Sequence, residues 1–212
     1  VPLGVVEQHG YHLPLTTDTI TACELGRRTA ERTRCLMAPP VNYAFSGGAL
    51  PGTINICPQV VSLLIMEICE SLVNQGFCNI ILLPGHGGTE NTRAIRDAAD
   101  MYQRRNEEKT DVLIAVPDLW KDSAIIQREM ARKDYHAGHL ETSMMLYWRP
   151  DLVRREAVTD TPDVMAMLSE DQDAYLVRDK AIDHDWVEPR IRQHPDIEVG
   201  VMGDPSAPDP AL

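Results

Sequence analysis

The chain has 212 residues, of which 43% are hydrophobic, and it carries a formal net charge of −12. This length and composition fit one α/β domain with a sizeable core. The acidic balance argues against a nucleic-acid backbone or an anionic membrane surface as partner, because both are bound by clustered lysines and arginines. We therefore expect a small-molecule ligand, with no nucleic acid and no membrane as partner.

The five cysteines are odd in number and include no C-x-x-C pair, so they indicate neither a disulfide framework nor a zinc knuckle. This usage favours a reducing, cytoplasmic location. No apolar run is long enough to cross a bilayer, and the start lacks the features of a secretory leader. Because the chain opens on a strand pattern and stops in residues rich in Pro and Asp, we expect residues 1–212 to be a single domain truncated at both ends.

Predicted strands and helices alternate along most of the chain. The expected strands cover residues 2–6, 35–38, 79–84 and 111–116, and the expected helices cover residues 18–34, 58–74, 91–105 and 144–148. The helix over 58–74 is well marked, with Pro58 at its start and Gly76 just past its end. Successive β-α-β units of this kind imply right-handed crossovers and a mostly parallel, doubly wound sheet with helices on both faces.

The most informative stretch is residues 7–18, which contain the carboxylates Glu7 and Asp18 and the imidazoles His9 and His12. It follows the first predicted strand, at the sheet edge where open α/β proteins bind their ligands. A mixed Glu/His/Asp set suits Zn, Mn or Fe and leaves room for two ions. The alternative is that the histidines are ordinary loop residues and that Asp18 caps the next helix.

A glycine-rich turn at 85–91 follows the predicted strand over 79–84. It matches neither GxGxxG nor GxxxxGK[ST], so it does not indicate a phosphate cradle. The turn instead places His86 at a second strand end. A lone loop histidine is more often solvated than bound to a metal, but parallel strands bring such loops side by side. We therefore expect His86 to approach the first cluster.

A third cluster lies at the start of the last predicted helix, where His136, His139 and Glu141 fall within six residues. Glu141 has a simple alternative explanation, because a carboxylate stabilises a helix N-terminus. The coincidence of three separate clusters of histidine and acid at loops or helix starts favours one shared site.

Several motifs, taken in order, resemble the motif set of the creatininase (creatinine amidohydrolase) family. They are Glu7-Gln8-His9-Gly10, Leu50-Pro51-Gly52-Thr53, Gly85-His86-Gly87-Gly88, His136-Ala137-Gly138 with Glu141-Thr142-Ser143, and Gly200-Val201-Met202-Gly203-Asp204-Pro205. Several motifs in one order are far more specific than a single motif. The resemblance implies a doubly wound, creatininase-like α/β domain with a two-metal centre and a homo-oligomeric, often hexameric, assembly.

The resemblance also implies roles for individual residues. It assigns Glu7 and His86 to one metal, His9 and Glu141 to the other, and Asp18 to a bridge between them. Zinc is the expected metal, with manganese or iron at one of the two sites. The resemblance makes His136 the catalytic histidine, with Glu141 counted beside it. The candidate substrate-binding residues are Tyr11, Gly87, Gly88, Tyr135 and His139.

The chain departs from the family pattern in two informative places. Creatininase has a glutamate ligand two residues after the position of His86, where this chain has Gly88, so Glu90 or water is the alternative ligand. Tyr11 stands where the family usually has proline. Because these changes fall where substrate specificity would be set, creatinine is not the expected substrate.

Two metals sharing one carboxylate indicate hydrolysis. A water that bridges two cations loses a proton near neutral pH and becomes a hydroxide nucleophile. His136 can pass a proton to the leaving nitrogen, since an unperturbed imidazole titrates at roughly 6.5. We expect a metal-dependent amidohydrolase acting on a small cyclic amide or related C–N bond. The alternatives are a formamide deformylase, a peptide-trimming or cyclitol ring-opening hydrolase of the same family, and a non-catalytic metal-binding homologue.

Overall fold

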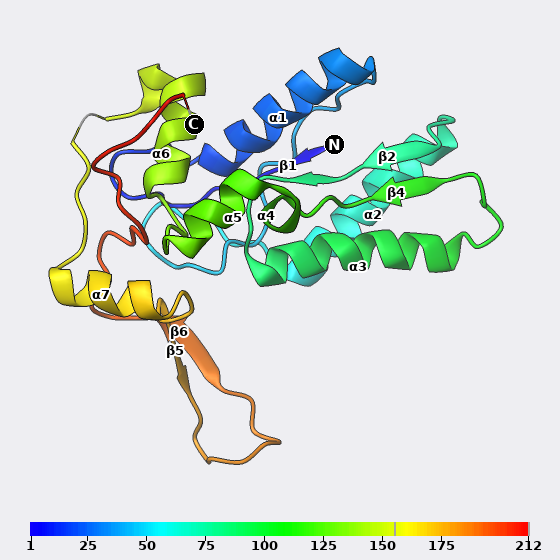
Figure 1. The fold of residues 1–212 in the computed structure, drawn as a ribbon. Coiled ribbons are helices and arrows are strands. Elements are labelled where there is room, and N and C mark those ends of the chain that lie inside the picture. The colour runs from blue at the N-terminus through cyan, green and yellow to red at the C-terminus, as the bar shows by residue number, and fades with distance from the viewer. Residues whose placement is uncertain (155, 212) are drawn as a thin grey trace. The chain divides into compact units, whose positions relative to one another are not determined.

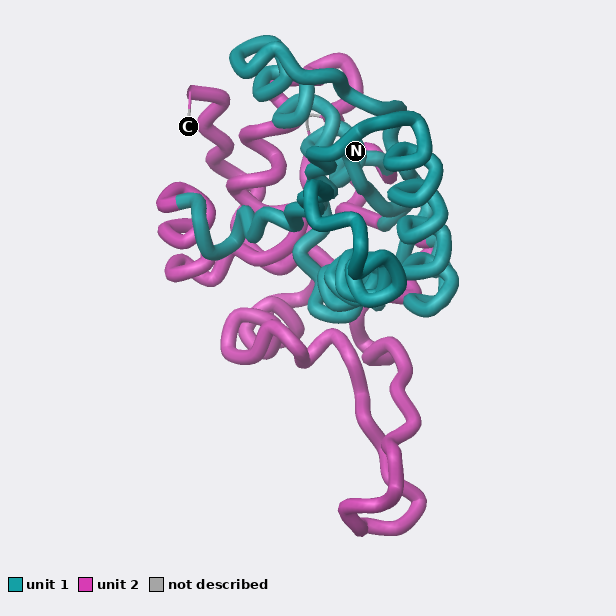
Figure 2. Tube along the Cα trace, turned by 90° about the vertical axis from the view of Figure 1, so that its right-hand side faces the viewer, with its two compact units in different colours: residues 1–7, 16–47, 54–123 teal, residues 8–15, 48–53, 124–212 magenta. Residues whose placement is uncertain are grey.

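The computed structural model describes residues 1–154 and 156–211. The chain forms two compact units, each built from segments that lie far apart in the sequence (Figure 2). Unit 1 comprises residues 1–7, 16–47 and 54–123, and unit 2 comprises residues 8–15, 48–53 and 124–212. The expectation of a single domain stays a prediction.

Unit 1 contains parallel strands, as the sequence predicted. The strands are β1 (Pro2–Leu3), β2 (Asn79–Ile81), β3 (Leu83–Pro84) and β4 (Leu113–Ala115). β1 pairs with β3 and β2 pairs with β4, both in parallel. Leu82, between β2 and β3, donates its N–H to the Ala115 carbonyl over 2.8 Å. The extended stretch 79–84 therefore lies between β1 and β4, which confirms an α/β fold with parallel strands.

The helices of unit 1 cover these strands. They are α1 (Thr17–Thr33), α2 (Pro58–Asn74), α3 (Thr89–Arg105) and the short α4 (Leu119–Asp122). Figure 1 shows α1 on one side of the strands and the pair α2 and α3 on the other. The main core lies under α2 and α3 and includes Leu3, Val5, Val61, Ile65, Ile80, Leu82, Ile95 and Tyr102. Each large apolar side chain buried there contributes about 1.5–3 kcal/mol to stability.

The helices predicted over 18–34, 58–74 and 91–105 are confirmed as α1, α2 and α3. α2 begins at Pro58, and Gly76 follows its end with a φ of 93°. α3 begins two residues earlier than predicted, directly after Gly88. The predicted strand over 2–6 is shorter in the structure, because only Pro2 and Leu3 form a regular strand.

The predicted strand over 35–38 is wrong. Leu36 in this segment is 82% exposed, and the segment belongs to no strand. After this segment, the chain first pairs with β1 at Val41, which donates its N–H to the Pro2 carbonyl over 3.0 Å. The reason is that Pro39 and Pro40 have no N–H to give to a sheet, so pairing begins only after them.

Unit 2 contains short helices and one antiparallel pair of strands. Its elements are α5 (Ala124–Ala131), α6 (His139–Trp148), a 3₁₀ turn (Pro150–Leu152), α7 (Pro162–Glu170) and the antiparallel pair β5 (Leu176–Asp179) and β6 (Arg190–Gln193). The apolar helix predicted over 144–148 is the second half of α6. Among the residues described, no helix has the length and apolar character needed to cross a membrane.

Candidate metal centre

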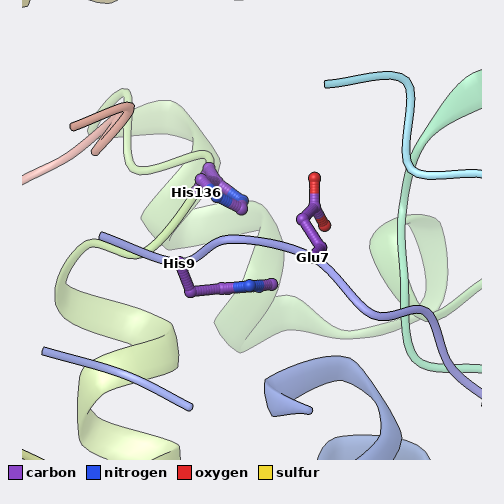
Figure 3. A group of neighbouring side chains, drawn as sticks. All are labelled: Glu7, His9 and His136. Carbon is purple, nitrogen blue, oxygen red and sulfur yellow. The ribbon is translucent and has the colours of Figure 1, made fainter. Parts of the chain in front are cut away.

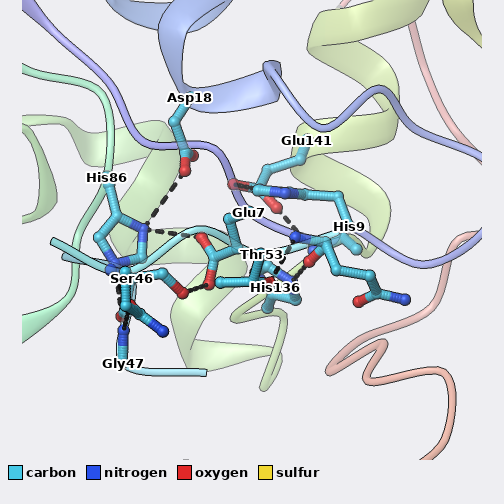
Figure 4. A network of polar contacts seen from close by, with 12 residues as sticks. Glu7, His9, Asp18, Ser46, Gly47, Thr53, His86, His136 and Glu141 are labelled. Carbon is cyan, nitrogen blue, oxygen red and sulfur yellow. Dashed lines mark hydrogen bonds and ion pairs between the residues drawn. The ribbon is translucent and has the colours of Figure 1, made fainter. Parts of the chain in front are cut away.

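In unit 1, Glu7, Asp18 and His86 converge, and we call them the unit 1 cluster. The Nδ1 atom of His86 lies 3.0 Å from Glu7 Oε2 and 3.4 Å from Asp18 Oδ2 (Figure 4). The three ligand atoms all lie within 4.8 Å of one another. Both carboxylates are buried, with exposures of 8% for Glu7 and 2% for Asp18. Two carboxylate oxygens and one imidazole nitrogen form a donor set that suits a divalent cation.

The charges in the unit 1 cluster explain how His86 titrates. Burial alone lowers the pKa of an imidazole, but the Glu7 and Asp18 carboxylates outweigh it and hold the pKa of His86 well above its ordinary value. A protonated His86 then supplies the positive charge that two buried carboxylates require. A metal ion needs the neutral ring, so a metal that bound at this cluster would release that proton.

Asp18 reaches the cluster from the first turn of α1. The sequence left open whether Asp18 is a ligand or a helix cap, and the structure places Thr16 at the N-cap position. Asp18 lies inside the helix, with its carboxylate directed at His86. Gly85 makes this approach possible, because a Cβ there would collide with the Asp18 backbone carbonyl. The end of β3 and the start of α1 can touch only through a residue without a side chain.

In unit 2, His9, His136 and Glu141 lie together, and we call them the unit 2 cluster. His9 Nε2 lies 3.6 Å from Glu141 Oε1, and His9 is fully buried. The rings of His9 and His136 are side by side, with centroids 4.3 Å apart and planes tilted by 41° (Figure 3). His136 Nε2 lies 2.8 Å from the Gln8 carbonyl oxygen, and this contact holds its ring in place.

Glu141 is the third residue of α6, and the backbone just before the helix orients it. Ala137 donates its N–H to Glu141 Oε2 over 2.6 Å. Burial by itself would raise the pKa of Glu141, but the His9 and His136 rings and the Ala137 N–H lower it to about 2. Glu141 is therefore ionised at neutral pH, with Oε1 directed at His9.

Two further histidines, His12 and His139, have contacts of their own. His12, 1% exposed, places Nε2 3.0 Å from Thr142 Oγ1 and so joins the segment 8–15 to α6. His139 places Nδ1 3.2 Å from the buried Glu129 carboxylate. Each of these imidazoles has a protein partner outside the two clusters.

The remaining predicted residues lie nearer the surface. Tyr11 is 50% exposed, and its hydroxyl lies 3.3 Å from the Glu198 carbonyl. Tyr135 is partly buried. Glu90 is exposed on α3 and is not part of the group of ligand atoms formed by the unit 1 cluster. The substrate-binding roles given to Tyr11, Gly87, Gly88, Tyr135 and His139 stay predictions.

The sequence reasoning missed residues that support the clusters, among them Asp134 and Trp120. Asp134 accepts the N–H groups of His139 and Leu140 over 2.7 and 2.8 Å, so it caps α6 from five and six residues away. Trp120 of α4 packs directly against Gly87, where a Cβ would collide with the indole. An acid just ahead of a helix start was a usable sign for Asp134. No local pattern pointed to Trp120.

Two buried clusters of histidine and carboxylate, one of them at the carboxyl ends of parallel strands, give this α/β protein side chains that are compatible with a metal site. The profile of the creatininase family, described as creatinine amidohydrolase, matches residues 1–212. The chain belongs to the creatininase family, which confirms the resemblance drawn from its motifs.

Curated relatives of two kinds match the chain. It is 34% identical over 159 residues to the mycofactocin precursor peptide peptidase of Mycolicibacterium smegmatis, covering 71% of this chain and 58% of that protein. It is 31% identical over 179 residues to the creatinine amidohydrolase of Pseudomonas putida, covering 76% of this chain and 68% of that protein. The chain thus spans less than two thirds of the peptidase.

Solved structures agree on the fold. A manganese form of creatininase matches with a TM-score of 0.67 and 29% identity, over 76% of this chain and 68% of that chain. A zinc–zinc form of a mutant creatininase matches with a TM-score of 0.70 and 25% identity, over 98% of this chain and 81% of that chain. The described fold is therefore creatininase-like.

Proposed function

We propose that this protein is a metal-dependent hydrolase that cleaves an amide or related C–N bond in a small, preferably cyclic, substrate. The observation that carries this proposal is the unit 1 cluster, in which two buried carboxylates face Nδ1 of His86 at 3.0 and 3.4 Å. The names of the relatives support the reaction class, because an amidohydrolase and a peptidase both hydrolyse C–N bonds. The fold of the full domain would be the doubly wound sheet of the family.

The donor atoms fit two divalent ions. Glu7, Asp18 and His86 would hold one ion, and His9 and Glu141 would hold the other. Asp18 as a bridging ligand is proposed on the family motif. Zinc is the first choice, with manganese or iron at one site, and the manganese and zinc–zinc forms of creatininase support the first two. When bound, such ions acidify water and polarise a carbonyl group under attack.

The residues of unit 2 would move the proton. A carbonyl oxygen only accepts hydrogen bonds, so the contact with Gln8 requires a hydrogen on His136 Nε2. The other ring nitrogen, Nδ1, is then the atom that takes up a proton from the attacking water. The same atom returns it to the leaving nitrogen when the C–N bond breaks.

A second candidate substrate is a peptide end, which the 34% identity to a precursor peptide peptidase favours. Deformylation of a formamide and ring opening of a cyclitol stay as further alternatives within the family. A non-catalytic metal-binding homologue is the alternative outside the enzymes. We also propose a homo-oligomer, with a hexamer as the family's usual assembly, which light scattering coupled to gel filtration would measure.

The test combines metal content with a substrate panel. Protein purified without chelator is analysed by mass spectrometry for Zn, Mn and Fe, and is then assayed on lactams, cyclic ureas, formamides and short peptides. The proposal expects bound metal and turnover of at least one amide that stops when metal is removed. Bound metal with no turnover on any substrate would favour the non-catalytic homologue. A folded protein that takes up no divalent ion would refute the metal-dependent function.

A further inference from the structure

Ser46 contacts two of the three residues in the unit 1 cluster. It is 5% exposed and lies in the loop between α1 and α2. Its hydroxyl donates to Glu7 Oε1 over 2.7 Å, and its backbone carbonyl oxygen lies 3.1 Å from His86 Nε2 (Figure 4). Ser46 thus contacts Glu7 Oε1 and His86 Nε2, whereas Glu7 and His86 contact each other through Oε2 and Nδ1.

The carbonyl of Ser46 decides which nitrogen of His86 can bind a metal. A carbonyl oxygen has no hydrogen to donate, so its partner Nε2 must carry one. In the neutral ring, Nδ1 is then the nitrogen with a free electron pair. Nδ1 is also the atom that faces Glu7 Oε2 and Asp18 Oδ2. Histidines that bind metals usually donate their second N–H to a carbonyl or carboxylate in this way.

The hydroxyl of Ser46 acts on Glu7. It donates to Oε1, and Oε2 is the oxygen that lies beside His86 Nδ1. A hydrogen bond to one oxygen of a carboxylate fixes the rotation of the whole group. Glu7 is thereby arranged to present a single oxygen, Oε2, to the space it shares with His86.

The loop that carries Ser46 is itself held in place. The N–H groups of Ser46 and Gly47 both donate to Asn55 Oδ1, over 2.9 and 3.1 Å. Ile54, the neighbour of Asn55, donates its N–H to the Val6 carbonyl over 2.9 Å. Since Val6 precedes Glu7, the loop is anchored one residue away from the carboxylate that Ser46 contacts.

Gly88 leaves room for this arrangement. A Cβ at position 88 would collide with His86 Nε2 and would lie 3.3 Å from the Ser46 carbonyl oxygen. The hydrogen bond between His86 and Ser46 therefore needs glycine at this position. Position 88 is a glutamate in creatininase. In this chain, the position of the His86 ring leaves no room for a side chain there.

We propose that Ser46, held by Asn55, is a positioning residue of the metal centre: its carbonyl selects Nδ1 of His86 as the metal ligand, and its hydroxyl selects Oε2 of Glu7. This inference rests on the proposed metal-dependent function and adds the residue that orders its ligands. Outer contacts of this kind typically change metal affinity by about 10–100-fold.

The test compares Ser46→Ala with Ser62→Ala. Ser62 is a matched control, because it is also 5% exposed in unit 1, and its hydroxyl donates to the Ala94 carbonyl over 2.8 Å away from the cluster. Both variants lose a buried hydroxyl, so both are expected to unfold at a slightly lower temperature without metal. Calorimetric titration of the chelator-treated proteins with ZnCl₂ and MnCl₂ should show about 10–100-fold weaker binding for Ser46→Ala alone. Ser46→Thr, which keeps the hydroxyl, should restore the affinity.

Gly88→Ala provides a second route that leaves Ser46 intact. Its methyl group should displace His86 from the Ser46 carbonyl and weaken zinc binding by a similar factor. Long-range ¹H–¹⁵N spectra of the zinc-loaded wild type should also show the Nε2–H form of His86. If the wild type binds zinc and both Ser46→Ala and Gly88→Ala bind it equally well, the positioning role is refuted while the proposed function stands. If the folded wild type binds no zinc or manganese, the proposed function itself fails.

Discussion

Ala137 donates its N–H to Glu141 Oε2 over 2.6 Å from a left-handed backbone conformation, with a φ of 53°. Few residues other than glycine adopt this conformation, and it costs a non-glycine residue about 1–2 kcal/mol. The strain is retained where the backbone turns into α6 and presents its N–H to a buried carboxylate. Fixing the Glu141 carboxylate is thus a consequence of how α6 begins.

The stability of the protein should depend on the ionisation of Glu141. Its pKa of about 2 in the folded state lies below the ordinary 4.5, so the ionised group stabilises the fold. This contribution is fully present above pH 4.5 and is lost as the pH falls through 2. The shift corresponds to roughly 3 kcal/mol. Guanidinium unfolding of chelator-treated wild type and Glu141→Gln should show a stability gap that narrows steadily as the pH falls from 5 to 2.5. A gap that does not change over this range would contradict the assignment.

Removing the cap of α6 should destabilise unit 2. Asp134→Ala takes away the acceptor of two helix N–H groups, which should cost about 1–2 kcal/mol in the free energy of unfolding. Asp163→Ala is the control, because Asp163 lies exposed in the first turn of α7. It should change the unfolding free energy by less than about 0.5 kcal/mol. Equal effects of the two variants would mean that Asp134 does not act as a cap.

Asp160 of unit 2 holds the segment that pairs with His136. Asp160 accepts the N–H groups of Glu198, Val199 and Gly200 over 2.8, 2.9 and 2.6 Å. The chain then continues to Met202, which pairs with His136 in an isolated bridge.

Asp160→Ala should therefore loosen residues 198–202 and lower kcat, while metal affinity stays within about twofold because the ligands are untouched. Hydrogen exchange of these amides and a zinc titration measure the two effects. Unchanged hydrogen exchange at 198–202 would show that Asp160 does not hold this segment in place.

Glu90 gives a direct test of the alternative ligand. Because its side chain is exposed on α3, Glu90→Ala should leave zinc and manganese affinity within about twofold of the wild type, in contrast to Glu7→Ala. A loss of one metal equivalent in Glu90→Ala would instead make Glu90 the replacement for the glutamate that this chain lacks.

The residues of the clusters could be predicted from the sequence where they follow a predicted strand or stand at a predicted helix start. Glu7 and His86 follow apolar strands, and parallel strands bring such ends to one edge of a sheet. His136 and Glu141 stand at a helix start within an ordered motif set. Chemically distinctive side chains at marked positions were sufficient for these predictions.

The supporting contacts could not be predicted, because they depend on the fold. Ser46 reaches Glu7 across 39 positions of the sequence, and its contact with His86 uses a backbone carbonyl that every residue possesses. The error at 35–38 has a similar origin, since an apolar run alone does not show whether a neighbouring strand is available for pairing. Only the three-dimensional arrangement reveals that Val41 takes that place.

The most direct test of the metal centre is the metal content of Asp18→Asn. Asparagine keeps the size of the side chain and removes the charge that faces His86 at 3.4 Å. Glu31→Gln is the control, because Glu31 is an exposed acid on the same helix. Mass spectrometry on protein purified without chelator should find metal in the wild type and in Glu31→Gln, and little in Asp18→Asn, which should also lose amide hydrolysis. Full metal content and full turnover in Asp18→Asn would contradict the account.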